Sequence, residues 1–390
     1  MTRPLTALLA MMLAAGLTVS ARAQGTLSAL QTDVDAIARK ARPSVVTVFA
    51  ARAVPGATAA SAPSRVRTRA GSGVAVESNL VLTTASVILD ADRILIGASD
   101  GQHAEAEVVG VDPVFNLALL RVRDLKLPPL AFASGRPARV GDWMISLGTS
   151  YSAQPTQSLG NVAQRHREPG QWLLQLTNTV YPGNSGAAAL NIHGELAALV
   201  QGELGSPDLT GSGGDRAGSA SFAMPVETLR PVVESLKREG RVRHGYLGVT
   251  TSAASFTNEG EEGPGMPIGA LVEGVIGSAP ADHMGLRPGD LIVAFDGERV
   301  ETPEQLARWV LATPPGRSVT LVWVRRDVGH TATVTLGESR DRVPQWLEGS
   351  SPGPDAGPDT PRKTAELDRE LQRLGRELSR LKEPAGSSPR

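Results

Sequence analysis

The feature that most constrains the fold is a series of short strand-like runs separated by turn residues. These runs lie at Gly73–Val76, Leu80–Thr83, Arg93–Gly97, Glu107–Val111, Leu117–Val122, Trp143–Leu147, Trp172–Leu176 and Leu196–Val200. Many short strands at close spacing predict an all-β sandwich or barrel. A helical face over Leu27–Ala41 precedes them, and a β-branched run, Val45–Val48, begins the first strand after Pro43 ends the helix.

Length and composition narrow the class of protein. The 390 residues suit two or three domains with a sizeable core, and the 41% apolar content is typical of a globular chain. A net charge of −1 gives no electrostatic case for binding nucleic acid. The chain has no cysteine, which excludes disulfides, thiolate nucleophiles and cysteine-ligated metals. None of the six histidines stands in a metal-ligand pair, so we expect no metal and no cofactor.

The N-terminus has the three parts of a secretory signal peptide. Arg3 is followed by an apolar run over Leu5–Val19 and by Ala21-Arg22-Ala23, an Ala-x-Ala site. We predict a signal peptide over residues 1–23, cut after Ala23, and a periplasmic or secreted mature protein. An uncleaved membrane anchor is the alternative, for which the run is somewhat short.

The strongest candidate for chemistry is a tight turn over Tyr181–Gly186, with the sequence Tyr-Pro-Gly-Asn-Ser-Gly. Its glycines tolerate a positive φ and a close backbone approach, so the hydroxyl of Ser185 can project outward. The N–H groups of Gly183 and Ser185 could then converge on one point, as an oxyanion hole requires. Serine and glycine also crowd together in ordinary turns, so this pattern alone is weak.

The segment Leu174–Gly186 resembles the nucleophile segment of the HtrA (DegP/DegS-like) family of trypsin-fold proteases with PDZ domains. The resemblance runs collinearly from about Ala41 to Leu336. Its other pieces are Gly71–Val74, Val109–Pro113, Ser221–Pro225 and Gly245–Val249. It implies a mainly β fold, in which the paired barrels of trypsin precede an α+β PDZ domain and a short C-terminal amphipathic helix follows it.

The same resemblance implies that two of the three catalytic residues are replaced. Ser86 stands where the family has its general-base histidine, and Asn116 stands where it has the orienting aspartate. Only Ser185, the nucleophile position, remains, with Gly183 at the oxyanion hole. In well-studied triads, losing the base costs about 10⁶ in turnover and replacing the aspartate by asparagine about 10⁴. The sequence therefore predicts a pseudoprotease.

Residues Tyr246, Leu247, Gly248 and Val249 resemble the loop with which a PDZ domain captures the C-terminal carboxylate of a peptide. The peptide then adds as a strand beside the strand that follows the loop. A helix from Pro303 to about Ala312 is expected to wall the groove, with Leu306 and Val310 as peptide-binding candidates. In the same helix, Trp309 is more typical of a core residue than of a ligand contact.

The chain thus divides into a series of expected segments. These are a signal peptide (1–23), a trypsin-like domain (24–240), a PDZ domain (241–340), a Pro/Gly linker (341–362) and an amphipathic or coiled-coil helix (363–383). Within the first domain, Arg52–Ala70 and Gly202–Gly218 read as loops. Leucines in the last segment form a short a/d seam, which fits either self-association or a helix that folds onto a partner.

Three functions remain open on these grounds. The first is a periplasmic pseudoprotease that binds peptides, protein C-termini or unfolded envelope proteins, for quality control, sensing or scaffolding. The second is an atypical serine endopeptidase that uses Ser185 with a substitute base, for which His166 and His103 are the first candidates. The third is an adaptor that works through the PDZ domain and the C-terminal helix. For each of these functions, the expected C-terminal helix predicts that the chain forms a homo-oligomer or binds a partner protein.

Overall fold

The computed structural model describes residues 26–53, 66–150, 154–203, 221–256, 266–339 and residue 373. The predicted signal peptide, the linker and nearly all of the predicted C-terminal helix lie outside the described residues. Most of the Gly202–Gly218 loop and the middle of the Arg52–Ala70 loop also lie outside them. No helix in the described part of the chain is both long enough and apolar enough to cross a membrane.

The first of two closed barrels follows a helix over residues 26–41 and a short 3-10 turn, η1 (Arg42–Ser44). The order of its strands is β1 (Val45–Ala53), β2 (Val66–Glu77), β3 (Leu80–Thr83), β6 (Leu117–Val122), β5 (His103–Asp112) and β4 (Arg93–Gly97). A one-turn helix, α2 (Ala85–Ile88), follows β3. The Arg52–Ala70 prediction was too long a loop, because β1 continues to Ala53 and β2 already begins at Val66.

The second barrel uses the later strands. Their order is β10 (Ala188–Leu190), β11 (Leu196–Glu203), β12 (Ser221–Pro225), β9 (Gln171–Leu176), β8 (Pro155–Glu168) and β7 (Trp143–Thr149). The helix α3 (Val226–Glu239) follows and ends at Gly240, whose φ of 69° is the left-handed conformation of a helix C-cap. Its buried residues, among them Leu229 and Leu236, join a core cluster that contains residues of both barrels.

The third unit is the PDZ domain, with two helices, α4 (Pro280–His283) and α5 (Pro303–Ala312). Its main sheet has the order β14 (Val249–Phe256), β15 (Met266–Val275), β16 (Leu291–Phe295), β18 (Ser318–Arg325) and β19 (Val328–Thr335), with β17 (Glu298–Arg299) paired to β16. A two-stranded sheet joins β13 (Gly245–Tyr246) to β20 (Gly337–Glu338). The predicted mainly β fold, a double barrel followed by a PDZ domain, is confirmed.

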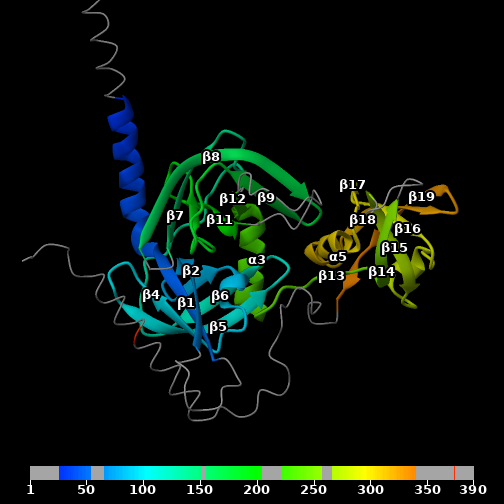
Figure 1. Cartoon of the computed structure of the whole chain (residues 1–390), viewed down its shortest axis with the longest axis horizontal. Helices are drawn as coiled ribbons and strands as arrows, with labels where there is room; N and C mark the ends of the chain where they lie inside the picture. The colour runs from blue at the N-terminus through cyan, green and yellow to red at the C-terminus, as the bar shows by residue number, and fades with distance from the viewer. Residues whose placement is uncertain are drawn as a thin grey trace, which may run out of the picture.

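The PDZ domain lies beside the second barrel and α3 (Figure 1). Leu311 and Ala312, at the end of α5, belong to the core cluster of the barrels rather than to that of the PDZ domain. Gly170, at the tip of the β8–β9 hairpin, sits so close to the backbone of Ala312 that an added Cβ would overlap it. The C-terminal end of α5 is therefore packed directly on the protease-like domain.

An ion pair between the buried Asp290 and the partly exposed Arg325 links β18 of the PDZ sheet to the turn before β16. Asp290 is 1% exposed, and both its carboxylate oxygens accept hydrogen bonds from Arg325, at 2.6 and 2.7 Å. It also accepts one from the N–H of Arg287, at 2.8 Å. Burial alone would raise the pKa of Asp290, but these donors outweigh it and lower the pKa below its usual range.

We predict that Asp290→Asn lowers the free energy of unfolding of the PDZ domain by about 2 kcal/mol at neutral pH, because an amide loses a charge-assisted hydrogen bond from the partly exposed Arg325. Since the folded pKa of Asp290 is lowered, its contribution is present above the unfolded pKa of about 3.9 and is lost as the pH falls through the folded pKa. Urea unfolding at neutral and acidic pH measures both effects. Asp327→Asn, in the β18–β19 turn, is the control. If both variants lost the same free energy of unfolding, the Asp290–Arg325 pair would not stabilise the domain as proposed.

Candidate functional site

The turn that carries Ser185 is closed by two hydrogen bonds between its ends. The N–H of Asn184 donates to the carbonyl of Tyr181 at 2.9 Å, and the N–H of Tyr181 donates to Oδ1 of Asn184 at 2.9 Å. Gly183 has a φ of 99° directly after Pro182. Proline followed by a residue with positive φ is the signature of a type II turn, so this sequence and this conformation agree.

Ser72, in β2 of the first barrel, forms hydrogen bonds with this turn across the interface between the two barrels. Its hydroxyl donates to the carbonyl of Gly183 at 2.8 Å and accepts from the N–H of Thr149 at 2.9 Å. Its backbone N–H donates to the carbonyl of Ser185 at 2.8 Å. Ser72 is fully buried. The Gly71–Val74 piece therefore positions the nucleophile turn, a role that its sequence alone does not reveal.

The Ser185 turn leaves its own donors unused within the described part of the chain. Neither the N–H of Gly183, nor the N–H of Ser185, nor the Ser185 hydroxyl forms a hydrogen bond with another described residue. Gly183 is buried and Ser185 is half-buried. Two backbone donors and a hydroxyl remain available for a bound group, which is what an oxyanion hole needs.

Ser86 and Asn116, the two substituted positions, lie together in the first barrel. The N–H of Ser86 donates to Oδ1 of Asn116 at 2.9 Å. The Ser86 side chain is exposed in α2, and its hydroxyl donates to Oγ1 of Thr84 at 3.2 Å. Nδ2 of Asn116 donates to Oε1 of Gln201, on β11 of the second barrel, at 3.0 Å. The two positions are adjacent, but neither supplies a group that can accept a proton near neutral pH.

No histidine side chain forms a hydrogen bond with the Ser185 turn within the described part of the chain. His166 shares a hydrogen bond with Gln175 at 3.3 Å and packs on Phe222, and His103 is the first residue of β5 rather than part of the preceding turn. His193 is exposed in the β10–β11 turn. His244, His283 and His330 follow α3 or lie in the PDZ domain. None of the six forms a hydrogen bond with Ser185. The described residues also contain no cluster of three metal-ligating side chains.

The predicted peptide-binding residues divide into two groups. Leu247, Leu306 and Val310 are buried in the PDZ core, as Trp309 is, while Val249 packs on the edge of that core. Tyr246 is half-buried. Gly248 has a φ of 84°, and an added Cβ would overlap the Cβ of Ala279, so only glycine fits there. The strand that follows the loop, β14, lies at one edge of the main sheet.

We predict that Ser72→Ala lowers the free energy of unfolding by about 2 kcal/mol, because it leaves the Gly183 carbonyl and the Thr149 N–H buried without their partner. Ser44→Ala is the matched control, because Ser44 is also buried but its hydroxyl has no hydrogen bond to another described residue. Urea denaturation of both variants checks this. If the two substitutions cost the same, the hydroxyl of Ser72 does not hold the turn.

Comparison with known families places both parts of the chain. Residues 71–199 match the trypsin-like peptidase domain, and residues 271–325 match the PDZ domain. Two curated relatives are probable periplasmic serine endoproteases, DegP-like, from Halomonas elongata and Chlamydia trachomatis. They are 30% and 32% identical over 283 and 287 residues, which is 71% and 70% of this chain. The chain spans 58% and 55% of the length of these relatives.

Solved structures agree with this placement. The serine endoprotease from Yersinia pestis superimposes with a TM-score of 0.54 at 26% identity, over 78% of this chain and 98% of that one. The HtrA-type protease AlgW with decapeptide gives a TM-score of 0.56 at 25% identity, over 79% and 99%. The fold, the order of the domains and these similarities show that the chain is an HtrA/DegP-like protein, with a trypsin-type serine protease fold and a C-terminal PDZ domain.

Proposed function

We propose that this protein is a pseudoprotease of the HtrA type, which binds peptides or unfolded segments of other proteins without cutting them. The observation that carries the proposal is the Ser86–Asn116 pair, which occupies the base and orienting positions with side chains that cannot activate a serine. A serine hydroxyl is a poor nucleophile unless an adjacent base takes its proton. A hydroxyl at position 86 cannot act as that base.

The positions of the other candidate bases also support the proposal that Ser185 is not activated. His166 shares a hydrogen bond with Gln175, His103 is exposed at the start of β5, and no described side chain forms a hydrogen bond with the Ser185 hydroxyl. An atypical endopeptidase would need a base that reaches this hydroxyl. No described side chain is held by a hydrogen bond in that position, and cleavage that depends on Ser185 would overturn the proposal.

The intact nucleophile turn has a use in a protein that only binds. With the N–H groups of Gly183 and Ser185 unpaired, the turn can accept a peptide carbonyl in the position of an oxyanion hole. The PDZ domain adds a second site, because β14 lies at a sheet edge next to the Tyr246–Val249 loop, the arrangement that strand addition of a C-terminal peptide requires. Two weak sites on one chain bind an extended segment more tightly than either alone.

The compartment follows from the predicted signal peptide and from the relatives, which are named periplasmic. We propose that the mature protein acts in the periplasm on unfolded envelope proteins or on protein C-termini. The predicted leucine seam in residues 363–383 provides the surface for a homo-oligomer or for a partner protein.

Restoring the two lost residues tests the proposal directly. We predict that Ser86→His with Asn116→Asp produces measurable cleavage of casein. Residue 116 already contacts the backbone of residue 86, and Nε2 of Gln201 is buried without a partner, so the amide of Gln201 can turn and donate to an aspartate. Ser86→His alone should be slower by up to about 10⁴, because asparagine leaves the imidazole in the wrong tautomer.

The control for this experiment is the doubly repaired chain with Ser185→Ala added, which must be inactive. Circular dichroism establishes that each variant is folded. A repaired protein that folds but cuts nothing would show that the turn or the substrate cleft no longer has catalytic geometry. In that case, the Ser86–Asn116 pair would not be what separates this chain from an active protease.

A further inference from the structure

His244 lies between the two domains, in the segment that leads from α3 into β13. Its Nε2 lies 2.7 Å from Oδ2 of Asp112, at the end of β5 in the first barrel. Its Nδ1 lies 2.9 Å from the carbonyl oxygen of Leu311, in the last turn of α5 of the PDZ domain. The side chain of His244 is 8% exposed and that of Asp112 is 1% exposed. One buried ring thus contacts both domains.

The two partners fix the protonation state of the ring. A carboxylate and a backbone carbonyl can only accept hydrogen bonds, so both ring nitrogens must donate, and only the imidazolium form does so. The C-terminal end of α5 adds to this preference, because the partial negative charge of a helix C-terminus stabilises a cation. A neutral imidazole would place a lone pair against one of the two oxygens.

The charged side chains on neighbouring elements pair with groups other than the His244 ring. On the His244 segment, Arg243 pairs with Glu239 of α3 at 2.9 Å and lies 3.6 Å from Glu338 of β20. On α5, Arg308 lies 3.7 Å from Glu168 of β8. From the β5–β6 turn, Phe115 presents an aromatic ring to His244, with the ring centroids 6.2 Å apart. Asp112 is therefore the charged group that faces the ring.

Asp112 also shapes the turn that holds Asn116. Its Oδ1 accepts from the N–H of Phe115 at 2.8 Å, and Asn116 follows with a φ of 50° in the left-handed region. The carboxylate that pairs with His244 therefore also fixes the backbone from which Asn116 reaches Ser86. A contact of the PDZ domain is in this way connected to the substituted catalytic positions.

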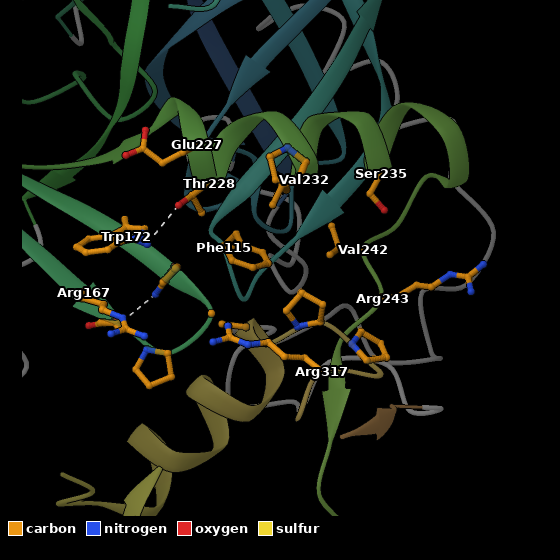
Figure 2. Close-up of a pocket in the computed structure, with 18 of the residues that line it drawn as sticks. Phe115, Arg167, Trp172, Glu227, Thr228, Val232, Ser235, Val242, Arg243 and Arg317 are labelled. Atoms are coloured by element: carbon orange, nitrogen blue, oxygen red, sulfur yellow. Dashed lines mark hydrogen bonds between the residues drawn. The ribbon is translucent and has the colours of Figure 1, made fainter. Parts of the chain in front are cut away.

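We propose that His244, in its charged form, is a pH-sensitive clamp that docks the PDZ domain onto the turn carrying Asn116. A cleft of about 1160 Å³ lies between the domains, and Phe115, which packs against His244, is one of the residues that line it. Phe115 and Val242 line it from the clamp side, and Arg317 lines it from the PDZ domain (Figure 2). Because this cleft leaves the boundary unpacked beside the contact of α5 with the barrels, loss of the His244 contact can change how closely the domains sit. The proposal does not depend on whether Ser185 is active.

The direction of the pH dependence follows from the environment of the ring. Burial alone lowers the pKa of His244, but the hydrogen bond and charge of Asp112, with the Leu311 carbonyl, outweigh it and raise the pKa above the ordinary value. A raised folded pKa means that the stabilisation is fully present below about pH 6.5, the unfolded value, and is lost as the pH rises through the folded pKa. Acid therefore favours the docked state, and alkali favours release.

Fluorescence energy transfer within the full mature chain tests this. The protein has no cysteine, so Val108→Cys in β5 and Val328→Cys in the β18–β19 hairpin, 49% and 57% exposed, accept a donor and an acceptor dye without competition. A large excess of unlabelled protein removes transfer between molecules. We expect transfer to be constant below about pH 6.5 and to change in one titration with its midpoint above that value. Circular dichroism over the same range separates undocking from unfolding.

Two substitutions and a control test whether His244 is the group that titrates. His244→Gln is uncharged and carries both its N–H donors on one nitrogen, so it cannot replace the two ring nitrogens that face Asp112 and Leu311, and transfer should stay at the undocked value at every pH. His244→Arg keeps a permanent charge and should remove the titration. His193→Gln, at an exposed histidine of the second barrel, should titrate like the wild type. A flat wild-type profile up to about pH 9.5, or a His244→Gln profile that matches the wild type, would overturn the proposal.

Discussion

The conformation of the Ser185 turn depends on hydrogen bonds from Ser72, a residue of the other barrel. Ser72 spans the interface between the two barrels with three hydrogen bonds: its N–H to the Ser185 carbonyl, its hydroxyl to the Gly183 carbonyl, and the N–H of Thr149 to its hydroxyl. All three are buried, where an unpaired donor or acceptor is costly. Gly186 approaches the Ser72 carbonyl so closely that a side chain there would overlap it. The same contacts therefore fix both the position of one barrel against the other and the conformation of the Ser185 turn.

This constraint means that the conformation of the Ser185 turn does not depend on the residues at positions 86 and 116. None of the contacts that hold the turn involves Ser86 or Asn116, so replacing the base and its partner does not release it. The two substituted residues also still contact each other, through the backbone of residue 86 and the amide of Asn116. The turn presents backbone donors beside a hydroxyl that has no hydrogen bond to another described residue, which is the geometry on which the proposed binding function rests. The clamp at His244 then gives the PDZ domain a physical connection to the same region through Asp112.

Local sequence signals were enough for much of the fold. The bounds predicted for the Leu80–Thr83 and Leu117–Val122 strands and for the helix over Pro303–Ala312 coincide with β3, β6 and α5. Turn residues and apolar periodicity define each of them within a few residues. The full extent of the long strand β8 was not predicted, because its polar side chains hide the alternation. Its pairing with β7 and β9 is what makes it a strand.

The site was predictable only as far as its residues sit in recognisable patterns. Ser86, Asn116, Gly183 and Ser185 could be named from such patterns, but their roles stay predictions until activity is measured. The functions of Ser72 and His244 depend on contacts between segments far apart in the chain. For His244, the available signal was a histidine placed directly before the Gly245–Val249 piece and an Asp112 that the triad pattern did not use. No local rule connects the two.

The most direct test of the central claim is incubation of the purified mature protein with fluorescently labelled, unfolded casein, beside Ser185→Ala. Anisotropy measures binding, and gel electrophoresis of the same samples measures cleavage. We expect casein to be bound and to stay intact with both proteins. Cleavage by the wild type that Ser185→Ala abolishes would contradict this expectation, because a base would then have to reach Ser185 from outside the Ser86–Asn116 pair. Absence of binding to both proteins would contradict the proposed function as well.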